Sequence, residues 1–321
     1  MNWNAFRKTQ TAGYVFIVLG ILNWSGNFVA ARGLAGTVEP ATLNLLRWVL
    51  ATAIFLPFGF RAFWRERHTV ARLWKELTVL ALTGISLYDM VIFLAGRTTE
   101  ALNMSLIATL SPLFTALVAQ FIFKENIRSS MYAGIAVSTL GIVLLVTDGD
   151  FSRLLSMRFA AGDLLILSSA VMSAVYNTII SKIAGKISQV TLFMSLCFFG
   201  TLYIIPMYLW ETGGQLLLPE FTPDLIWSLL YLAVCASILC CLFWNEAVQI
   251  MGAPKAMMFY YTLPPVSAAI AWVVIDEPVN LNQILSGTII LAGILFALYG
   301  GSPKIRRQEK LIDVQPSEIG Y

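Results

Sequence analysis

Charged residues are scarce in this sequence. Only 12% of its 321 residues are Asp, Glu, Lys or Arg, and 58% are apolar, whereas a soluble domain usually carries about 25% charged residues. This scarcity excludes a water-soluble globule, a coiled coil and a disordered chain, because too few charges exist to cover the surface. The formal net charge of +3 is too small to indicate nucleic-acid binding. The composition therefore predicts a membrane protein.

Histidine and cysteine are also rare. The one histidine, His68, lies in a basic segment, and every cysteine lies inside an apolar run. No cysteine has the spacing to a histidine that a metal site needs, so we interpret the cysteines as small buried apolar residues. The sequence thus indicates no metal, no cofactor and no disulfide framework. The four cysteines are Cys197, Cys235, Cys240 and Cys241.

Long apolar runs dominate what is present. Ten runs of about 20 mostly apolar residues follow one another, and a helix of that length crosses the hydrocarbon core of a bilayer. The runs are too long for barrel strands, and their short connections favour antiparallel neighbours. We therefore expect an all-α membrane protein with ten transmembrane helices. The predicted spans are Thr11–Ala31, Ala41–Phe60, Leu73–Leu94, Ala101–Phe123, Ser130–Thr147, Ala161–Lys182, Gln189–Trp210, Asp224–Asn245, Ala253–Ile275 and Leu281–Gly300.

The Lys and Arg residues predict the orientation of these spans. With the N-terminus in the cytoplasm, sixteen of the 21 Lys and Arg residues fall on the cytoplasmic side. Four fall outside, and Arg47 lies within a span. Because positive charge concentrates on the cytoplasmic side of membrane proteins, we expect both termini to be cytoplasmic. We also expect the first run to be retained, since it is long for the apolar part of a signal peptide.

The chain contains a weak internal repeat. Residues 101–125 resemble residues 253–277, and an offset of 152 places Pro112 on Pro264 and Glu125 on Glu277. Spans one to five thus correspond to spans six to ten. Because five is odd, the second half enters the membrane from the opposite side, and the repeat is inverted, as is common in secondary transporters. The expected division is 1–148 and 160–301 for the two repeats, and 302–321 for a polar cytoplasmic tail.

Two charged residues stand inside predicted spans. Arg47 in the second span and Asp89 in the third lie roughly 9 Å and 8 Å below the outer edge, at 1.5 Å per residue. They either form a structural ion pair or face a cavity, where Arg47 suits a carboxylate and Asp89 suits an ammonium group or a proton. Snorkelling towards lipid is a third possibility. The repeat maps them onto Cys197 and Cys241, so the charged feature is asymmetric, as expected of a ligand site.

Uncharged polar and aromatic residues form a second set of candidates. Aromatic side chains with a polar tip suit a cavity that binds a partly apolar solute, although ordinary helix packing and interfacial belts use the same residues. Asn27 and Asn177 coincide at an offset of 150, which favours a cavity role or an interhelical hydrogen bond. The candidates are Trp24, Asn27, Tyr88, Asn103, Tyr176, Asn177, Trp244 and Tyr260.

Short motifs in the spans carry a family resemblance. They are Trp24-Ser25-Gly26-Asn27-Phe28, Leu46-Arg47-Trp48 and the Pro…Glu ends of spans four and nine. With two five-span halves, they resemble the drug/metabolite transporter superfamily, in its ten-span EamA type, over about residues 11–300. The resemblance implies a carrier of the bacterial inner membrane with a central cavity. It also implies that the carrier exports or exchanges amino acids, related metabolites or other small organic solutes.

We therefore predict a secondary transporter that moves a small organic solute by alternating access, with export of an amino acid or related metabolite as the expected activity. Its partners are the solute, the lipid bilayer and, if Asp89 titrates, protons. Both a monomer and a homodimer remain open. A membrane enzyme acting on a lipid-linked substrate is an alternative, but the sequence lacks HExxH, GxSxG, a Walker lysine loop and any histidine within a span. A channel or sensor is another, although no charged ring or filter sequence is visible.

Overall fold

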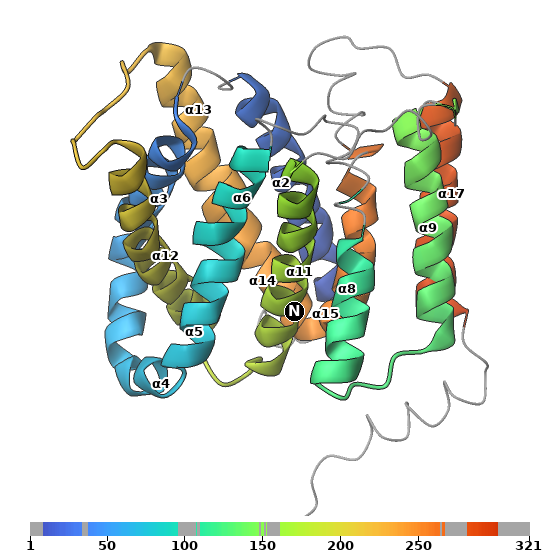
Figure 1. Ribbon diagram of the computed structural model, residues 1–321. Coiled ribbons are helices and arrows are strands. Elements are labelled where there is room, and N and C mark those ends of the chain that lie inside the picture. The colour runs from blue at the N-terminus through green and yellow to red at the C-terminus, as the bar shows by residue number, and fades with distance from the viewer. Residues whose placement is uncertain are drawn as a thin grey trace, which may run out of the picture.

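The computed structural model describes a chain of helices (Figure 1). It describes residues 9–33, 38–95, 107, 110–147, 149–150, 152, 161–263, 265–266 and 281–300, with the backbone alone for 26–33, 93, 146, 161, 163 and 283. No strand occurs among these residues, which agrees with the predicted all-α class. The predicted tail, 302–321, lies outside the described residues.

The helices of the two halves follow the same order along the chain. The first half forms α2 (Gln10–Gly33), α3 (Pro40–Arg65), α4 (Arg67–Arg72), α5 (Trp74–Ala81), α6 (Leu87–Ala95), α8 (Ser111–Leu117) and α9 (Ser129–Thr147). The second half forms α11 (Ala161–Lys182), α12 (Gln189–Glu211), α13 (Pro223–Ala233), α14 (Cys240–Met251), α15 (Ala253–Met258) and α17 (Leu281–Tyr299).

Several predicted spans contain a change of helix type. The π-helical segment η1 (Leu82–Ser86) joins α5 to α6, and η3 (Val234–Leu239) joins α13 to α14. A third π-helical segment, η2 (Val118–Ile122), follows α8, and a 3₁₀ turn, η4 (Phe259–Thr262), follows α15. Shifted by the repeat offset of 152, η1 coincides with η3. Such π segments frequently mark functional sites in helices.

Four of these helical stretches are long and apolar enough to cross a membrane: Pro40–Arg65, Leu164–Lys182, Gln189–Glu211 and Pro223–Met251. Three shorter apolar helices also occur in the part of the chain that the structure describes: Ser111–Ile122, Ser129–Leu145 and Ile284–Tyr299. These seven stretches overlap seven of the ten predicted spans. The chain is therefore a multi-pass membrane protein, while the full count of ten spans stays a prediction.

Positive charge gathers at one end of the bundle. The end of α3, α4, the connection from α8 to α9 and the connection from α11 to α12 all lie at the lower end in Figure 1. The segment 212–222, which joins α12 to α13 at the upper end, carries no Lys or Arg. By the positive-inside rule, the lower end is the expected cytoplasmic end. The basic residues of the lower elements are Arg61, Arg65, Arg67, Arg72, Lys75, Lys124, Arg128, Lys182 and Lys186.

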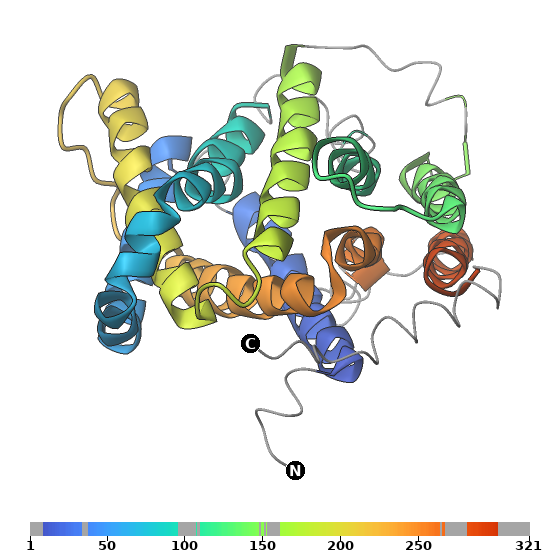
Figure 2. The same ribbon diagram turned by 90° about the horizontal axis from the view of Figure 1, so that it is seen from below.

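Contacts between the two halves come in matching pairs. α2 packs against α14, and α11 packs against α6, which are equivalent contacts once the halves are exchanged. α3 packs against its counterpart α12. α9 packs against its counterpart α17, and Figure 2 shows these two helices side by side at one edge. The two halves therefore use equivalent helices to contact each other.

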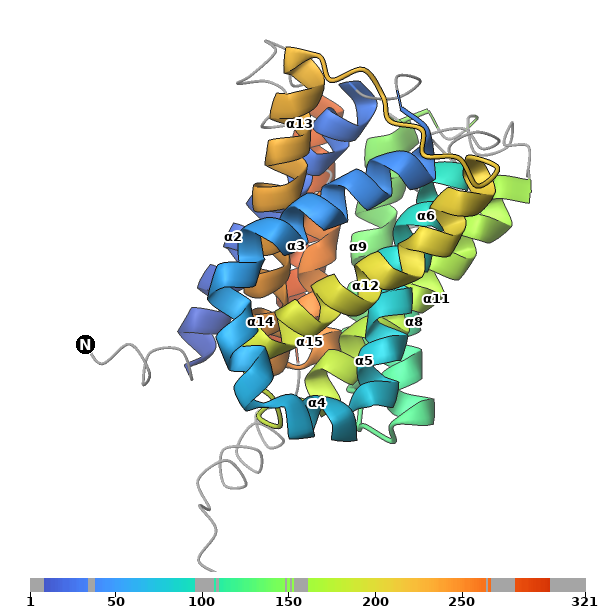
Figure 3. The ribbon, with the colours of Figure 1, turned by 90° about the vertical axis from the view of Figure 1, so that its left-hand side faces the viewer.

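The pair of α3 and α12, side by side in Figure 3, is joined at both ends by glutamates. The carboxylate of Glu211, at the end of α12, accepts hydrogen bonds from the backbone N–H groups of Ala41 and Thr42, each at 2.9 Å, and from the Thr42 hydroxyl at 3.0 Å. At the opposite end, Glu66 accepts a hydrogen bond from the backbone N–H of Ser188 at 3.0 Å. Each glutamate thus satisfies free N–H groups at the start of the other helix, where a negative charge is favourable.

Glu211→Ala is expected to lower the free energy of unfolding by about 1–2 kcal/mol, because the first N–H groups of α3 lose their acceptor. The measurement is thermal unfolding of the purified protein in detergent. Glu220→Ala is the matched control, since Glu220 is exposed on the same connecting segment. Equal melting temperatures for the two variants would contradict a stabilising role for Glu211.

Candidate functional site

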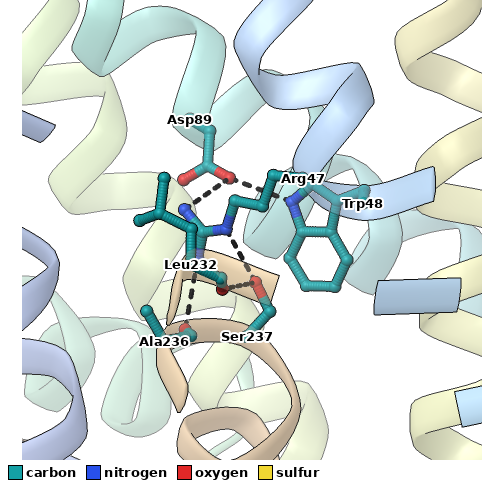
Figure 4. A network of polar contacts seen from close by, with 6 residues as sticks. All are labelled: Arg47, Trp48, Asp89, Leu232, Ala236 and Ser237. Carbon is teal, nitrogen blue, oxygen red and sulfur yellow. Dashed lines mark hydrogen bonds and ion pairs between the residues drawn. The ribbon is translucent and has the colours of Figure 1, made fainter. Parts of the chain in front are cut away.

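Arg47 lies two turns into α3 and is directed at the π-helical segment of the second half (Figure 4). Its Nε donates a hydrogen bond to Ser237 Oγ at 2.6 Å, and its Nη2 donates to the backbone oxygen of Ala236 at 3.2 Å. The Ser237 hydroxyl in turn donates to the backbone oxygen of Leu232 at 2.8 Å, five residues earlier. The irregular helix η3 therefore supplies both hydrogen-bond acceptors of a buried guanidinium.

Asp89 lies in the first turn of α6 and faces the same network. Its Oδ2 accepts a hydrogen bond from Trp48 Nε1 at 3.2 Å and lies 3.9 Å from Arg47 Nη1. A distance of 3.9 Å is too long for a hydrogen bond, so Arg47 and Asp89 form an ion pair without a direct hydrogen bond. The side chains of Arg47 and Asp89 are 8% and 15% exposed. The sequence placed these two residues at similar depth and left open whether they pair, and the structure brings their side chains together.

The guanidinium of Arg47 retains unused donors. It carries five N–H groups, and two of them are used in the hydrogen bonds to Ser237 and Ala236. Its carbon lies 5.5 Å from the centre of the Trp48 ring, within the range of a cation–π contact. A planar cation held from one side in this way can still bind a carboxylate with two parallel hydrogen bonds.

An aromatic cluster adjoins the charged pair. The ring of Trp24 on α2 meets the rings of Trp244 on α14 and Tyr260 on η4 edge-on, with centroids 5.4 Å and 5.7 Å apart. The side chain of Tyr260 lies close to that of Tyr88, the residue before Asp89 on α6. Trp24, Tyr88 and Tyr260 are all partly exposed, although they lie among packed helices. The cluster therefore connects both halves of the chain to the charged pair.

Amide side chains continue the network on the second half. Trp244 Nε1 donates to Asn177 Oδ1 at 2.6 Å, so α14 is joined to α11. Asn177 also donates to the backbone oxygen of Ser173 at 2.8 Å, and the Tyr176 hydroxyl donates to Asn245 Oδ1 at 2.8 Å. These side chains are buried, and the hydrogen bonds offset part of the cost of removing their polar groups from water. The Nδ2 of Asn245 has no partner among the described residues.

The structure describes the side chains of eight of the ten predicted site residues, and these residues contact one another or directly precede or follow one that does. The side chain of Asn27 and the whole of Asn103 lie outside the described residues. Sequence reasoning missed Trp48 and Ser237 as members of the group. Ser237 had a weak signal, since the repeat offset places Ser86 of η1 only one residue away from it. The eight residues are Trp24, Arg47, Tyr88, Asp89, Tyr176, Asn177, Trp244 and Tyr260.

The chain is similar to known membrane transporters along most of its length. The sequence model of the EamA-like transporter family matches residues 11–147 and again residues 160–299. An uncharacterized transporter of Archaeoglobus fulgidus is 27% identical over 283 residues, which are 88% of this chain and 95% of that protein. The uncharacterized transporter YyaM of Bacillus subtilis is 25% identical over 286 residues, which are 88% of this chain and 92% of that protein.

Two further similarities concern a named solute and the fold. A probable terminal-alkyne amino-acid exporter of Streptantibioticus cattleyicolor is 24% identical over 287 residues, which are 87% of this chain and 91% of that protein. A solved crystal structure superposes with a TM-score of 0.74 at 19% identity, over 94% of this chain and 100% of that chain. The second similarity concerns the fold alone.

Proposed function

Since the chain belongs to the EamA-like transporter family, we propose that it is a secondary transporter that exports a small amino acid or related metabolite across the bacterial inner membrane. The arrangement of Arg47 and Asp89 carries this proposal. Both charges lie inside helices of a membrane protein, where a central charge costs about 2.5–3.5 kcal/mol on insertion scales. A cost of that size favours a function for the pair.

The chemistry of the pair indicates the class of solute. Arg47 has unused donors suited to a carboxylate, and Asp89 remains partly exposed and suits an ammonium group. An amino acid carries both groups. The neighbouring rings of Trp24, Tyr88 and Tyr260 suit an apolar side chain on the same solute. The similarity to a probable amino-acid exporter supports the same class.

The internal repeat supports a mechanism of alternating access. In our proposal, repeats 1–148 and 160–301 have inverted orientation and rock against each other around the site, with both termini and the tail 302–321 in the cytoplasm. The matching contacts between the halves and the coincidence of η1 with η3 support this mechanism, because two equivalent halves can exchange conformations.

Flux measurements in liposomes test the proposal. A thermal-shift screen of amino acids, amines, nucleosides and organic acids selects the ligands, and the purified protein is then reconstituted with the labelled hits. We expect saturable uptake and counterflow for at least one amino acid. Flux that rises linearly with concentration would indicate a channel instead, and chemical conversion of the solute would indicate an enzyme.

Asp89→Asn is expected to raise the KM for a transported amino acid by about tenfold or more, because the ammonium group loses a charge-assisted hydrogen bond worth about 1.5–3 kcal/mol. The asparagine oxygen still accepts the hydrogen bond from Trp48 Nε1. The measurement is the concentration dependence of flux for the amino acid and for the same acid without its amino group.

For the acid without the amino group, the KM of Asp89→Asn should stay close to that of the parent protein. That solute has no ammonium group that residue 89 could bind. Asp224→Asn is the matched control, because Asp224 is exposed in the first turn of α13. An Asp89→Asn protein with an unchanged KM for the amino acid would exclude Asp89 as the ammonium site.

A further inference from the structure

Asn44 carries a buried amide one turn before Arg47. The sequence analysis did not single out this residue. It lies on α3, three residues before Arg47, and is 1% exposed. Neither its Nδ2 nor its Oδ1 has a hydrogen-bond partner among the described residues. Buried amides are almost always hydrogen bonded. An amide with no partner on either atom therefore needs an explanation.

The neighbours of Asn44 on α3 show where its side chain points. Leu43 packs into a cluster with α13, and Ala41 packs into a cluster with α6 and α12. Val49, on the opposite face of α3, is 45% exposed. At 100° per residue, Asn44 lies between the faces of Leu43 and Ala41. Its carboxamide therefore points into the bundle, between α13 and α6.

Asn44 also shares its face of α3 with the charged network. Side chains of helices lean towards the N-terminus of the helix, over the turn that precedes them. Arg47 and Trp48 therefore lean towards the turn that holds Asn44. Both already contact Asp89, Arg47 at 3.9 Å and Trp48 through its hydrogen bond. The unpaired amide thus lies on the same side of α3 as Arg47, one turn nearer the start of the helix.

The packing offers no structural reason for an amide at this position. Asn177, also buried, accepts a hydrogen bond from Trp244, and Asn245 accepts one from Tyr176. Asn44 makes no equivalent bond to any residue that the structure describes. Leucine has the same branching as asparagine and would fill the position without an unpaired polar group. A residue that lowers the stability of the protein without a structural benefit is typical of a functional site.

We propose that Asn44 completes the solute site, where its Nδ2 donates a hydrogen bond to the carboxylate held by Arg47. The proposal rests on the proposed function, because it requires a solute with a carboxylate. Arg47 supplies the charge, and Asn44 supplies a second, neutral donor on the side of the site nearer the start of α3. Asn44 thereby selects a carboxylate over its uncharged ester, which has one good acceptor fewer.

Flux of an amino acid and of its methyl ester through Asn44→Leu tests this role. We expect the KM for the acid to rise about tenfold, while the KM for the ester changes less than twofold. We also expect the melting temperature to rise, because the unpaired amide is gone. Asn126→Leu is the matched control, since Asn126 is exposed on the connection between α8 and α9. Asn44→Ala provides a smaller side chain should leucine prevent folding, and the same change in KM is expected.

Each outcome bears on one proposal or on both. An unchanged KM for the acid in a folded Asn44 variant, with saturable flux in the parent protein, would overturn the role of Asn44 alone. A lower melting temperature with equal losses for acid and ester would also overturn it, because that result indicates packing. Absence of saturable flux for every carboxylate in the parent protein would overturn the proposed function and this role together.

Discussion

Arg47→Ala is expected to lower saturable flux of a carboxylate solute by about 100-fold or more. The guanidinium is the one group of the site that can bind a carboxylate with two charge-assisted hydrogen bonds, each worth about 1.5–3 kcal/mol. Every 1.4 kcal/mol corresponds to a tenfold change in affinity. The variant also leaves Asp89 without the cation that lies 3.9 Å away. The measurement is initial flux at several solute concentrations in proteoliposomes.

Three further variants separate binding from folding. Arg47→Lys keeps the charge but loses the planar fork, so we expect a loss between those of the alanine variant and the parent protein. Arg67→Ala is the matched control, because Arg67 is exposed and contacts Trp64 at the end of α3. If the ion pair were purely structural, each single variant would give a lower yield of folded protein. The double variant Arg47→Ala, Asp89→Asn would then restore that yield. Normal flux through folded Arg47→Ala would remove Arg47 from the site.

Gly293→Ala is expected to lower the free energy of unfolding by roughly 1–3 kcal/mol, the cost of overpacking a tight contact. A Cβ at Gly293 on α17 would lie 2.7 Å from the backbone nitrogen of Ser138 and 2.8 Å from the backbone oxygen of Gly134. Both atoms belong to the backbone of α9, so they move only if the two helices separate. Thermal unfolding and the yield of monodisperse protein measure the effect.

Gly287→Ala, on the same helix, is the matched control. Among the described residues, a Cβ at Gly287 would meet only the Pro265 side chain, at 3.8 Å, which is an ordinary contact. We expect this variant to gain roughly 0.5–1 kcal/mol, because alanine loses less entropy than glycine in a helix. A loss of stability in Gly293→Ala together with a gain in Gly287→Ala would locate the close contact of α9 and α17 at Gly293. Equal melting temperatures for both variants would show that the helices do not pack as closely as described.

The sequence predicted the long elements well because apolar length alone determines them. The span expected at Ala161–Lys182 is α11 with the same bounds, and the span expected at Gln189–Trp210 is one residue shorter than α12. The π-helical segments η1 and η3 were not predicted, since a local change in hydrogen bonding leaves the apolar composition unchanged. Helix type inside a span is decided by packing.

The site was predicted in part for a similar reason. The depths of Arg47 and Asp89 follow from the rise per residue, so their meeting was accessible from the sequence. The contact of Arg47 with Ser237 joins residues 190 positions apart. It depends on how α3 and η3 are rotated about their axes, which only the packed structure fixes. The inward direction of Asn44 depends on the same rotation.

The two glutamate caps make the paired helices α3 and α12 unequal at their ends. Three hydrogen bonds to Glu211 hold the end near segment 212–222, and one to Glu66 holds the basic end. Parting α3 from α12 at the basic end breaks one of these hydrogen bonds, whereas parting them at the other end breaks three. In the proposed mechanism of alternating access, this difference would make the basic end the easier one to open in the absence of solute.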